Sequence, residues 1–211
     1  MPVRETTIVV EGKTVTRKME TVIYPHPMLK HVSKPIRRID EQIREIVSEM
    51  FQIMYKDGGV GLAANQVNLP YQLFVMNETA DPEQKEAELC FINPVITKRK
   101  GREEGEEGCL SFPDLRLQVV RSSEITFQAI NLDGELVTHH WKGWPARIVQ
   151  HETDHLFGRC FYERAGMAGA IAAQDILRSL ELIYNGNAER GFTQTEEEFL
   201  AYCQMMEAKQ A

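Results

Sequence analysis

The apolar positions between residues 39 and 56 recur with the spacing of an amphipathic helix. In IDEQIREIVSEMFQIMYK they fall at 39, 43, 46, 47, 50, 51, 53 and 54, on one side of a helix with 3.6 residues per turn. A second helix is predicted between Pro145, which suits a first turn, and Gly158, which suits a C-terminal stop. Trp144, Ile148, His151 and His155 recur there at spacings of 4, 3 and 4. They form one stripe along this helix.

Shorter apolar runs predict β-strands. They are YQLFVM at 71–76, FINPVIT at 91–97, LQVVR at 117–121 and, on either side of an L-D-G turn, EITFQAI at 124–130 and ELVTHHWKG at 135–143. At the N-terminus, TTIVVEGKTVTRKMETV indicates two short strands around a turn at Glu11, Gly12 and Lys13. Most of the chain is therefore expected to form antiparallel strands.

The C-terminal segment is expected to be helical. Residues 166–184 are rich in small residues and then become apolar-periodic, and Thr195 opens a final helix with the capping-box pattern T-E-E-E. The whole pattern predicts an α+β fold in which antiparallel strands surround one central helix. We divide it into an N-terminal β extension (1–21), a catalytic core (22–163) and a C-terminal helical extension (164–211).

Composition narrows the class of protein. The 211 residues suffice for one domain with appendages, and the net charge of −7 indicates no basic face for nucleic acid. No apolar run reaches 18 residues, so no membrane span is expected. The N-terminus lacks an apolar signal region, which favours a cytoplasmic location. Of the four cysteines, at 90, 109, 160 and 203, those other than Cys109 are interpreted as reduced packing residues.

The run HETDH at 151–155 is the strongest candidate for chemistry. Histidines four apart lie on one side of a helix, so His151 and His155 can reach one metal ion. Glu152 points to the side, where it can contact a water on that ion rather than bind the ion itself. Two ligands beside a base are parts of a metal-dependent hydrolase. The site still needs a third ligand.

Two further segments bear on that question. Cys109, in EEGCLSFP, could supply a thiolate that completes a three-ligand set with an open fourth position, although a lone Cys is more often a packing residue. GGVGLAANQ at 58–66 is too rich in glycine at its start for a helix interior. It lacks the G-K-[ST] ending of a phosphate-binding loop, so nucleotide binding is not expected.

Together, GVGLAANQ at 59–66, EGCLS at 107–111 and HETDHL at 151–156 resemble the three signature motifs of the peptide deformylases, in that family's order. The similarity extends from about residue 22 to about residue 163. It implies that the chain is a bacterial-type enzyme of this family. Such an enzyme hydrolyses the N-terminal formyl group of formyl-methionyl nascent peptides to formate and a free amine.

The resemblance implies a role for each matching residue. The metal ligands are Cys109, His151 and His155; the catalytic carboxylate is Glu152; the oxyanion donors are the Gln66 amide and the Leu110 backbone N–H; Gly61 lies close to substrate; Glu107 and Arg116 form a charged pair that supports the ligand loop. The family prefers Fe²⁺ in the cell, with Zn²⁺, Ni²⁺ or Co²⁺ as replacements. One such ion per chain is expected, since sulfur and imidazole ligands disfavour Mg²⁺ and Ca²⁺.

The helix stripe adds candidates for the substrate pocket. Ile148 and Trp144 precede His151 by one and two turns, so both are expected to line the space that receives the methionine side chain. Val60, between two glycines of the first motif, is expected to face the same space. Either helix residue could instead belong to the core, as residues of apolar stripes usually do.

Two alternatives come from other classes of protein. HETDHLFG begins the H-E-x-x-H-x-x-G run of a zinc metallopeptidase, but position 161 is Phe where that class needs a third His. His139 or His140 could supply a fourth ligand to a closed, structural zinc site, although a solvated strand end is the more ordinary use. The acidic tail, with four basic and seven acidic residues after 163, does not favour ribosome binding. It is expected to pack on its own core or on a second subunit, so a homodimer stays open.

Overall fold

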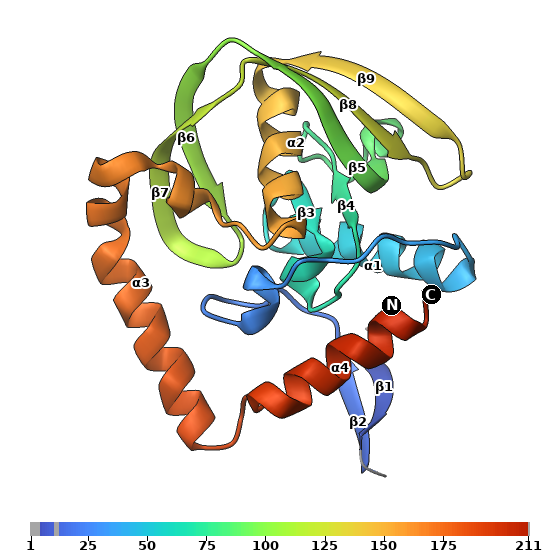
Figure 1. Cartoon of the computed structure of the whole chain (residues 1–211), viewed down its shortest axis with the longest axis vertical. Helices are drawn as coiled ribbons and strands as arrows, with labels where there is room; N and C mark the ends of the chain where they lie inside the picture. The colour runs from blue at the N-terminus through green and yellow to red at the C-terminus, as the bar shows by residue number, and fades with distance from the viewer. Residues whose placement is uncertain (1–4, 11–12, 211) are drawn as a thin grey trace.

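The computed structural model describes residues 5–10 and 13–210. Figure 1 shows the arrangement of the elements in space. The helices are α1 (Glu41–Lys56), α2 (Gly143–Leu156), α3 (Gly166–Glu189) and α4 (Glu196–Ala208). The strands are β1 (Glu5–Val10), β2 (Lys13–Lys18), β3 (Gly61–Ala63), β4 (Leu73–Met76), β5 (Leu89–Lys100), β6 (Glu103–Cys109), β7 (Phe112–Arg121), β8 (Glu124–Ile130) and β9 (Leu136–Lys142).

Helix α2 lies at the centre of the molecule. On one side it packs against the five-stranded antiparallel sheet β3-β4-β5-β8-β9. The two-stranded ribbon β6-β7 lies on its other side (Figure 1). Every residue from Ala146 to Leu156 is buried, including several that carry charge. The predicted α+β arrangement with a central helix is confirmed, and any polar side chain on α2 must find its partner inside the protein.

The predicted N-terminal strands are also present. Strands β1 and β2 pair in antiparallel register, from Glu5 opposite Lys18 to Val10 opposite Lys13. Of the predicted turn, residues 11–12 lie outside the described part of the chain. The first predicted helix is present as α1. Asp40 accepts a hydrogen bond from the N–H of Ile43 and so caps its N-terminus.

Strand β6 is the main element that the hydrophobic pattern did not predict. Its sequence EEGEEGC contains no alternation of apolar and polar residues. It forms because β7, whose inward residues are apolar, offers backbone partners from Arg121 to Arg116 and again at Phe112. Tertiary pairing thus overrides the local preference of a glycine- and glutamate-rich segment.

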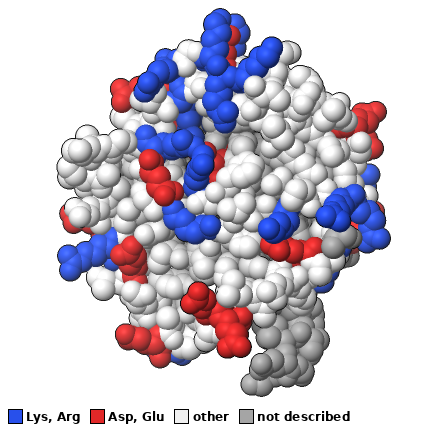
Figure 2. Space-filling view, in the orientation of Figure 1, with Lys and Arg blue, Asp and Glu red and all other residues white. Residues whose placement is uncertain are grey.

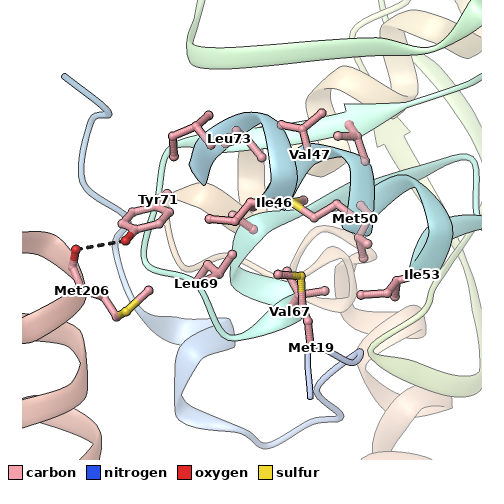
Figure 3. Close-up of a cluster of buried hydrophobic side chains, with 14 of the residues drawn as sticks. Met19, Ile46, Val47, Met50, Ile53, Val67, Leu69, Tyr71, Leu73 and Met206 are labelled. Carbon is pink, nitrogen blue, oxygen red and sulfur yellow. Dashed lines mark hydrogen bonds between the residues drawn. The ribbon is translucent and has the colours of Figure 1, made fainter. Parts of the chain in front are cut away.

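The C-terminal helix α4 belongs to the core of its own chain. Its Phe199, Tyr202, Cys203 and Met206 join the hydrophobic cluster formed by α1 and the segment before β4. The Tyr71 hydroxyl donates a hydrogen bond of 3.0 Å to the backbone oxygen of Met206 (Figure 3). The Thr195 capping box is present as predicted, with reciprocal hydrogen bonds to Glu198. Of the two arrangements expected for the tail, α4 therefore adopts packing on the core of its own chain.

The surface charge is unevenly distributed. Lys and Arg side chains gather at one end of the face shown in Figure 2. In the same orientation, Figure 1 places the β5–β6 turn at that end, and this turn and its flanks carry four exposed basic residues (Lys98, Arg99, Lys100 and Arg102). The net charge of the chain conceals this local cluster. Among the described residues, no helix has both the length and the apolar character needed to cross a membrane.

Candidate active site

The three candidate ligands meet in space. His151 and His155 project from the same side of α2, and Cys109 ends β6 opposite them. The Cys109 Sγ lies 3.3 Å from His155 Nε2. One ligand atom from each of the three residues can be chosen so that all lie within 4.8 Å of one another. The helix spacing and the end of a strand therefore build a single cluster of one sulfur and two nitrogens.

The match between β6 and α2 explains why the cluster forms. Glu107 and Cys109, two residues apart on a strand, point to the same side about 7 Å apart. His151 and His155, four apart on a helix, are separated by about 6 Å along its axis. The two spacings nearly agree, so Glu107 faces His151 while Cys109 faces His155. The end of β6, where its pairing with β7 shifts register between Gly108 and Cys109, and the helix α2 thus bring two pairs of side chains together.

Glu107 is the most connected carboxylate of the site. His151 Nδ1 lies 2.9 Å from its Oε2, which leaves the other ring nitrogen, Nε2, for a metal ion. Arg121 donates to both of its oxygens at 2.9 and 3.0 Å, and Arg147 donates to Oε1 at 2.8 Å. Burial alone would raise the pKa of Glu107, but the hydrogen bonds from His151 and Arg121 hold it well below its usual range.

The pairing of Glu107 with Arg116, which the resemblance implied, is wrong. Arg116 is largely exposed and its guanidinium lies 3.8 Å from Glu106, the neighbouring residue on the opposite side of the strand. Because side chains alternate across a strand, Glu106 and Glu107 cannot share a partner on one face. Glu107 faces inward, and its arginine partners are the buried Arg121 and Arg147.

A second buried carboxylate extends this network. Asp154, on α2, accepts hydrogen bonds from Arg121 and from Arg164, the latter bidentate at 3.0 and 2.6 Å. The pKa of Asp154 is lowered despite its burial, because these guanidinium groups outweigh the loss of water. Arg121 thus joins the two carboxylates, one beside His151 and one beside His155. It fixes β7 to α2 at the level of the ligands.

Gln66 directs an amide toward the ligand cluster. Its Oε1 accepts a hydrogen bond of 2.9 Å from the N–H of Ala63, which fixes the orientation of the amide. Its Nε2 donates to Cys109 Sγ and to Ser111 Oγ, both at 3.3 Å. Leu110 lines the same space between Cys109 and Ser111. An oriented N–H donor therefore lies within reach of any group bound beside the sulfur.

Glu152 lies against the first glycine-rich segment. A Cβ atom on Gly61 would stand 2.5 Å from Glu152 Oε1, so this position cannot hold a larger residue without displacing the carboxylate. Burial raises the pKa of Glu152 to about 7. Its Oε2 is buried and has no hydrogen-bond partner among the described residues. A carboxylate of this kind is suited to accept and return a proton near neutral pH.

The residues at this cluster fit a divalent metal ion. The pKa of His155 is held well below its usual range by burial and by His151, so its ring is neutral, as a ligand must be. The pKa of His151 is raised in spite of burial, because Cys109 and Glu107 favour a positive charge there. A pocket that attracts positive charge and offers sulfur and imidazole donors suits Zn²⁺ or Fe²⁺.

A cavity of about 990 Å³ opens on the cluster. Its lining includes Val60, Gly61, Trp144 and Ile148, all four of the residues that the sequence suggested for the substrate pocket. Ile148 also contributes to the core between α2 and the five-stranded sheet. Trp144 is 48% exposed, so it belongs to the rim of the cavity rather than to the core. Whether these side chains bind substrate stays a prediction.

Neither His139 nor His140 joins the ligand group among the residues described. The ring of His139 stacks on Phe127 with centroids 5.2 Å apart. His140 Nδ1 lies 2.9 Å from the Thr126 hydroxyl on the exposed side of the sheet. The closed four-ligand zinc site therefore has no support from their positions.

Sequence reasoning missed the arginines that hold the site together. Two signals were present. Arg121 continues the inward alternation of Leu117 and Val119 along β7, and Arg147 precedes His151 by one helical turn. A charged residue at a buried position of a strand or helix requires an opposite charge nearby. From those two positions the sequence could have predicted that a carboxylate lies inside the protein, but not that it belongs to Glu107.

Comparisons with known proteins agree on one family. A family profile described as "Polypeptide deformylase" matches residues 18–169. Peptide deformylases of Rhodopirellula baltica and Neisseria gonorrhoeae are 38% and 43% identical to this chain, covering 82% and 67% of it and 86% and 83% of their own lengths. Solved peptide deformylases are similar in structure. That of Arabidopsis thaliana (peptide deformylase 1B) has a TM-score of 0.77 at 37% identity, over 84% of this chain and 97% of that one. That of Thermotoga maritima has a TM-score of 0.66 at 34% identity, over 71% and 98%.

The arginine network generates a prediction about stability. The substitution Arg121→Met leaves Glu107 and Asp154 buried with fewer partners. It should lower the free energy of unfolding by about 3–5 kcal/mol. The matched control is Arg116→Met, because that exposed side chain should contribute less than about 0.5 kcal/mol. Urea unfolding of the metal-loaded proteins measures both. Equal losses in the two variants would contradict the assignment of Arg121 as the internal partner.

Proposed function

The chain belongs to the peptide deformylase family, and from that premise we propose which of its residues carry out the reaction. It is a hydrolase that removes the N-terminal formyl group from newly synthesised polypeptides. The observation that carries the proposal is the position of Glu152. This buried carboxylate with an unpartnered oxygen lies beside a cluster of one thiol and two imidazoles.

We assign Cys109, His151 and His155 as the protein ligands of one divalent metal ion. When bound, the ion would act as a Lewis acid that polarises water and the formyl carbonyl. Fe²⁺ is the ion we propose for the cell, with Zn²⁺, Ni²⁺ or Co²⁺ able to replace it, because all are compatible with sulfur and imidazole donors. Glu107 keeps His151 oriented for this task by accepting a hydrogen bond from its Nδ1–H.

Glu152 is assigned as the group that moves the proton. Because burial raises its pKa to about 7, it can remove a proton from the attacking water and later deliver it to the leaving amine. Gly61 is needed next to it because a side chain there would push the carboxylate out of position. Hydrolysis is then balanced: water supplies the hydroxyl of formate and the hydrogen of the amine.

Gln66 and the Leu110 backbone N–H are assigned as donors to the oxyanion that develops on the formyl carbonyl. The hydrogen bond from Ala63 to Gln66 Oε1 sets the amide so that Nε2 points toward Cys109. A preoriented donor of this kind contributes on the order of 3 kcal/mol to transition-state stabilisation. Because the Cys109 thiolate would offset part of the charge of the ion, these donors carry correspondingly more of the stabilisation.

The substrates are proposed to be nascent peptides that begin with formyl-methionine. The methionine side chain would occupy the cavity beside Ile148, with Val60 and Trp144 as further walls. An unbranched thioether suits an apolar slot of irregular shape. The zinc peptidase alternative is not favoured, because position 161 is Phe instead of the third histidine that its motif requires.

The first experiment separates proton transfer from metal binding. Glu152→Gln should keep one ion per chain but lower formate release from a formyl-Met peptide by about 10²–10⁴-fold, because the proton shuttle is lost. His151→Ala, His155→Ala and Cys109→Ala should each lose tight metal binding. Elemental analysis and a formate assay measure both properties, with Glu104→Gln, an exposed change outside the cavity lining, as the control that keeps them. Near-normal turnover in Glu152→Gln would leave this residue only a structural role.

A second experiment concerns the methionine pocket. Ile148→Ala should lower kcat/KM for a formyl-Met peptide by a factor that corresponds to about 1–3 kcal/mol of lost transition-state stabilisation. It should lower kcat/KM for a formyl-Ala peptide far less. The control is Val149→Ala, which removes a buried methyl pair of the same core cluster but does not line the cavity. It should leave the Met/Ala ratio unchanged. If Ile148→Ala lowers both substrates equally, Ile148 supports the helix and does not select the substrate.

A third experiment concerns the identity of the ion. If Fe²⁺ is the cellular metal, activity of the iron-loaded protein should decay in air and persist without oxygen, since Fe²⁺ and the Cys109 thiolate are both oxidisable. Exchange for Ni²⁺ should give an enzyme that is stable in air. The measurement is the half-life of formate release for each loaded form. Identical lifetimes of the iron form with and without oxygen would count against the proposal.

A further inference from the structure

Helix α3 carries a row of apolar side chains that the described part of the chain does not cover. Met167, Ile171 and Leu182 are 84%, 67% and 65% exposed, whereas Ala173 is the buried residue of this helix. Figure 1 shows α3 along one edge of the molecule, with the rest of the chain on one side of it. Large exposed apolar residues on one side of a helix commonly mark an interaction surface.

Two opposite charges interrupt the row at its middle. Met167, Ile171, Asp175, Arg178 and Leu182 follow one another at spacings of 4, 4, 3 and 4, so they lie on one side of the helix. Asp175 and Arg178 are exposed, and neither side chain forms a hydrogen bond or an ion pair within the described chain. We call these five residues the α3 stripe. Its charges are available to a partner.

The α3 stripe is complementary to itself when reversed. Ile171 and Leu182 are equally far from the point midway between residues 176 and 177, and so are Asp175 and Arg178. A two-fold axis at that point would place Ile171 at the level of Leu182 of the second copy, and Asp175 at the level of Arg178. Met167 would fall at the level of Gly186, where an added Cβ would have no atom within 4 Å. Apolar thus meets apolar, large meets small, and each charge meets its opposite.

We propose that α3 is the contact surface of a symmetric homodimer, in which two α3 helices pack antiparallel through this stripe. A two-fold interface requires one surface to complement itself, and the order of apolar and charged positions meets that requirement. The active-site cavity takes no part in this contact, because no α3 residue lines it. An interface centred on two helices lies at the small end of stable contacts, so association should depend on protein concentration.

Charge reversal tests the pairing directly. Asp175→Arg and Arg178→Asp each place like charges opposite one another twice across the axis. Each should raise the dimer dissociation constant at least tenfold in sedimentation velocity of the full chain. The double variant Asp175→Arg/Arg178→Asp restores opposite charges and should associate like the unchanged protein. Asp133→Arg, an exposed reversal in the β8–β9 turn, is the control that should leave association unchanged.

A mixture gives the most specific result. The two single variants carry complementary stripes, so combining them should produce a heterodimer although neither associates alone. Circular dichroism and formate release from a short peptide should match the unchanged protein in every variant, which separates this proposal from the proposed catalytic roles. A protein that stays monomeric at all concentrations would overturn it. Single reversals that leave association intact, or a mixture that forms no heterodimer, would do so as well.

Discussion

The buried carboxylate of Glu107 is the interaction on which the rest of the site depends. It joins three elements, because His151 and Arg147 come from α2 and Arg121 comes from β7, while Glu107 itself lies on β6. A charge this deep is stable only with complete hydrogen bonding, and its three partners supply it. The same contact fixes the ring of His151. The Glu107 carboxylate therefore contributes both to the stability of the fold and to the orientation of a candidate metal ligand.

The central position of α2 follows from the same constraint. The helix is buried along its whole inner length, and its Arg147, His151 and Asp154 take ionic partners from β6 and β7. Packing against these strands leaves Glu152 only 4% exposed. This raises the pKa of Glu152 while Arg121 and Arg164 keep Asp154 ionised. Two acids separated by one residue thus acquire opposite properties from their neighbours.

The C-terminal extension serves two purposes in this arrangement. Helix α4 returns to the main hydrophobic cluster and covers Tyr71. Helix α3, which precedes α4 in the chain, leaves its outer side exposed. Tyr24 donates a hydrogen bond of 2.7 Å to Glu181, which fixes the inner side of α3 to the catalytic core. The tail is thus anchored at both ends, and the exposed α3 stripe is the surface we assign to a second copy.

The sequence by itself determined the elements whose signal is local. The spacing of His151 and His155, the capping residues and the alternation in β7 to β9 each depend on a few neighbouring residues, and the α+β class followed from them. The motif order also identified the ligands and Glu152 as candidates. The prediction of the fold class succeeded because helix and strand periodicities are intrinsic to the backbone, whereas the roles of the site residues stay a proposal.

Only the tertiary structure decided which charges meet. Glu106 and Glu107 are adjacent and chemically identical, yet one pairs with an exposed Arg116 and the other with the buried Arg121 and Arg147. That choice depends on which face of β6 turns toward α2, and β6 has no apolar alternation to predict it. Long-range pairing sets the register of such a strand, and a one-residue shift would exchange the two faces. The partner of a buried charge is therefore a property of the fold rather than of the segment.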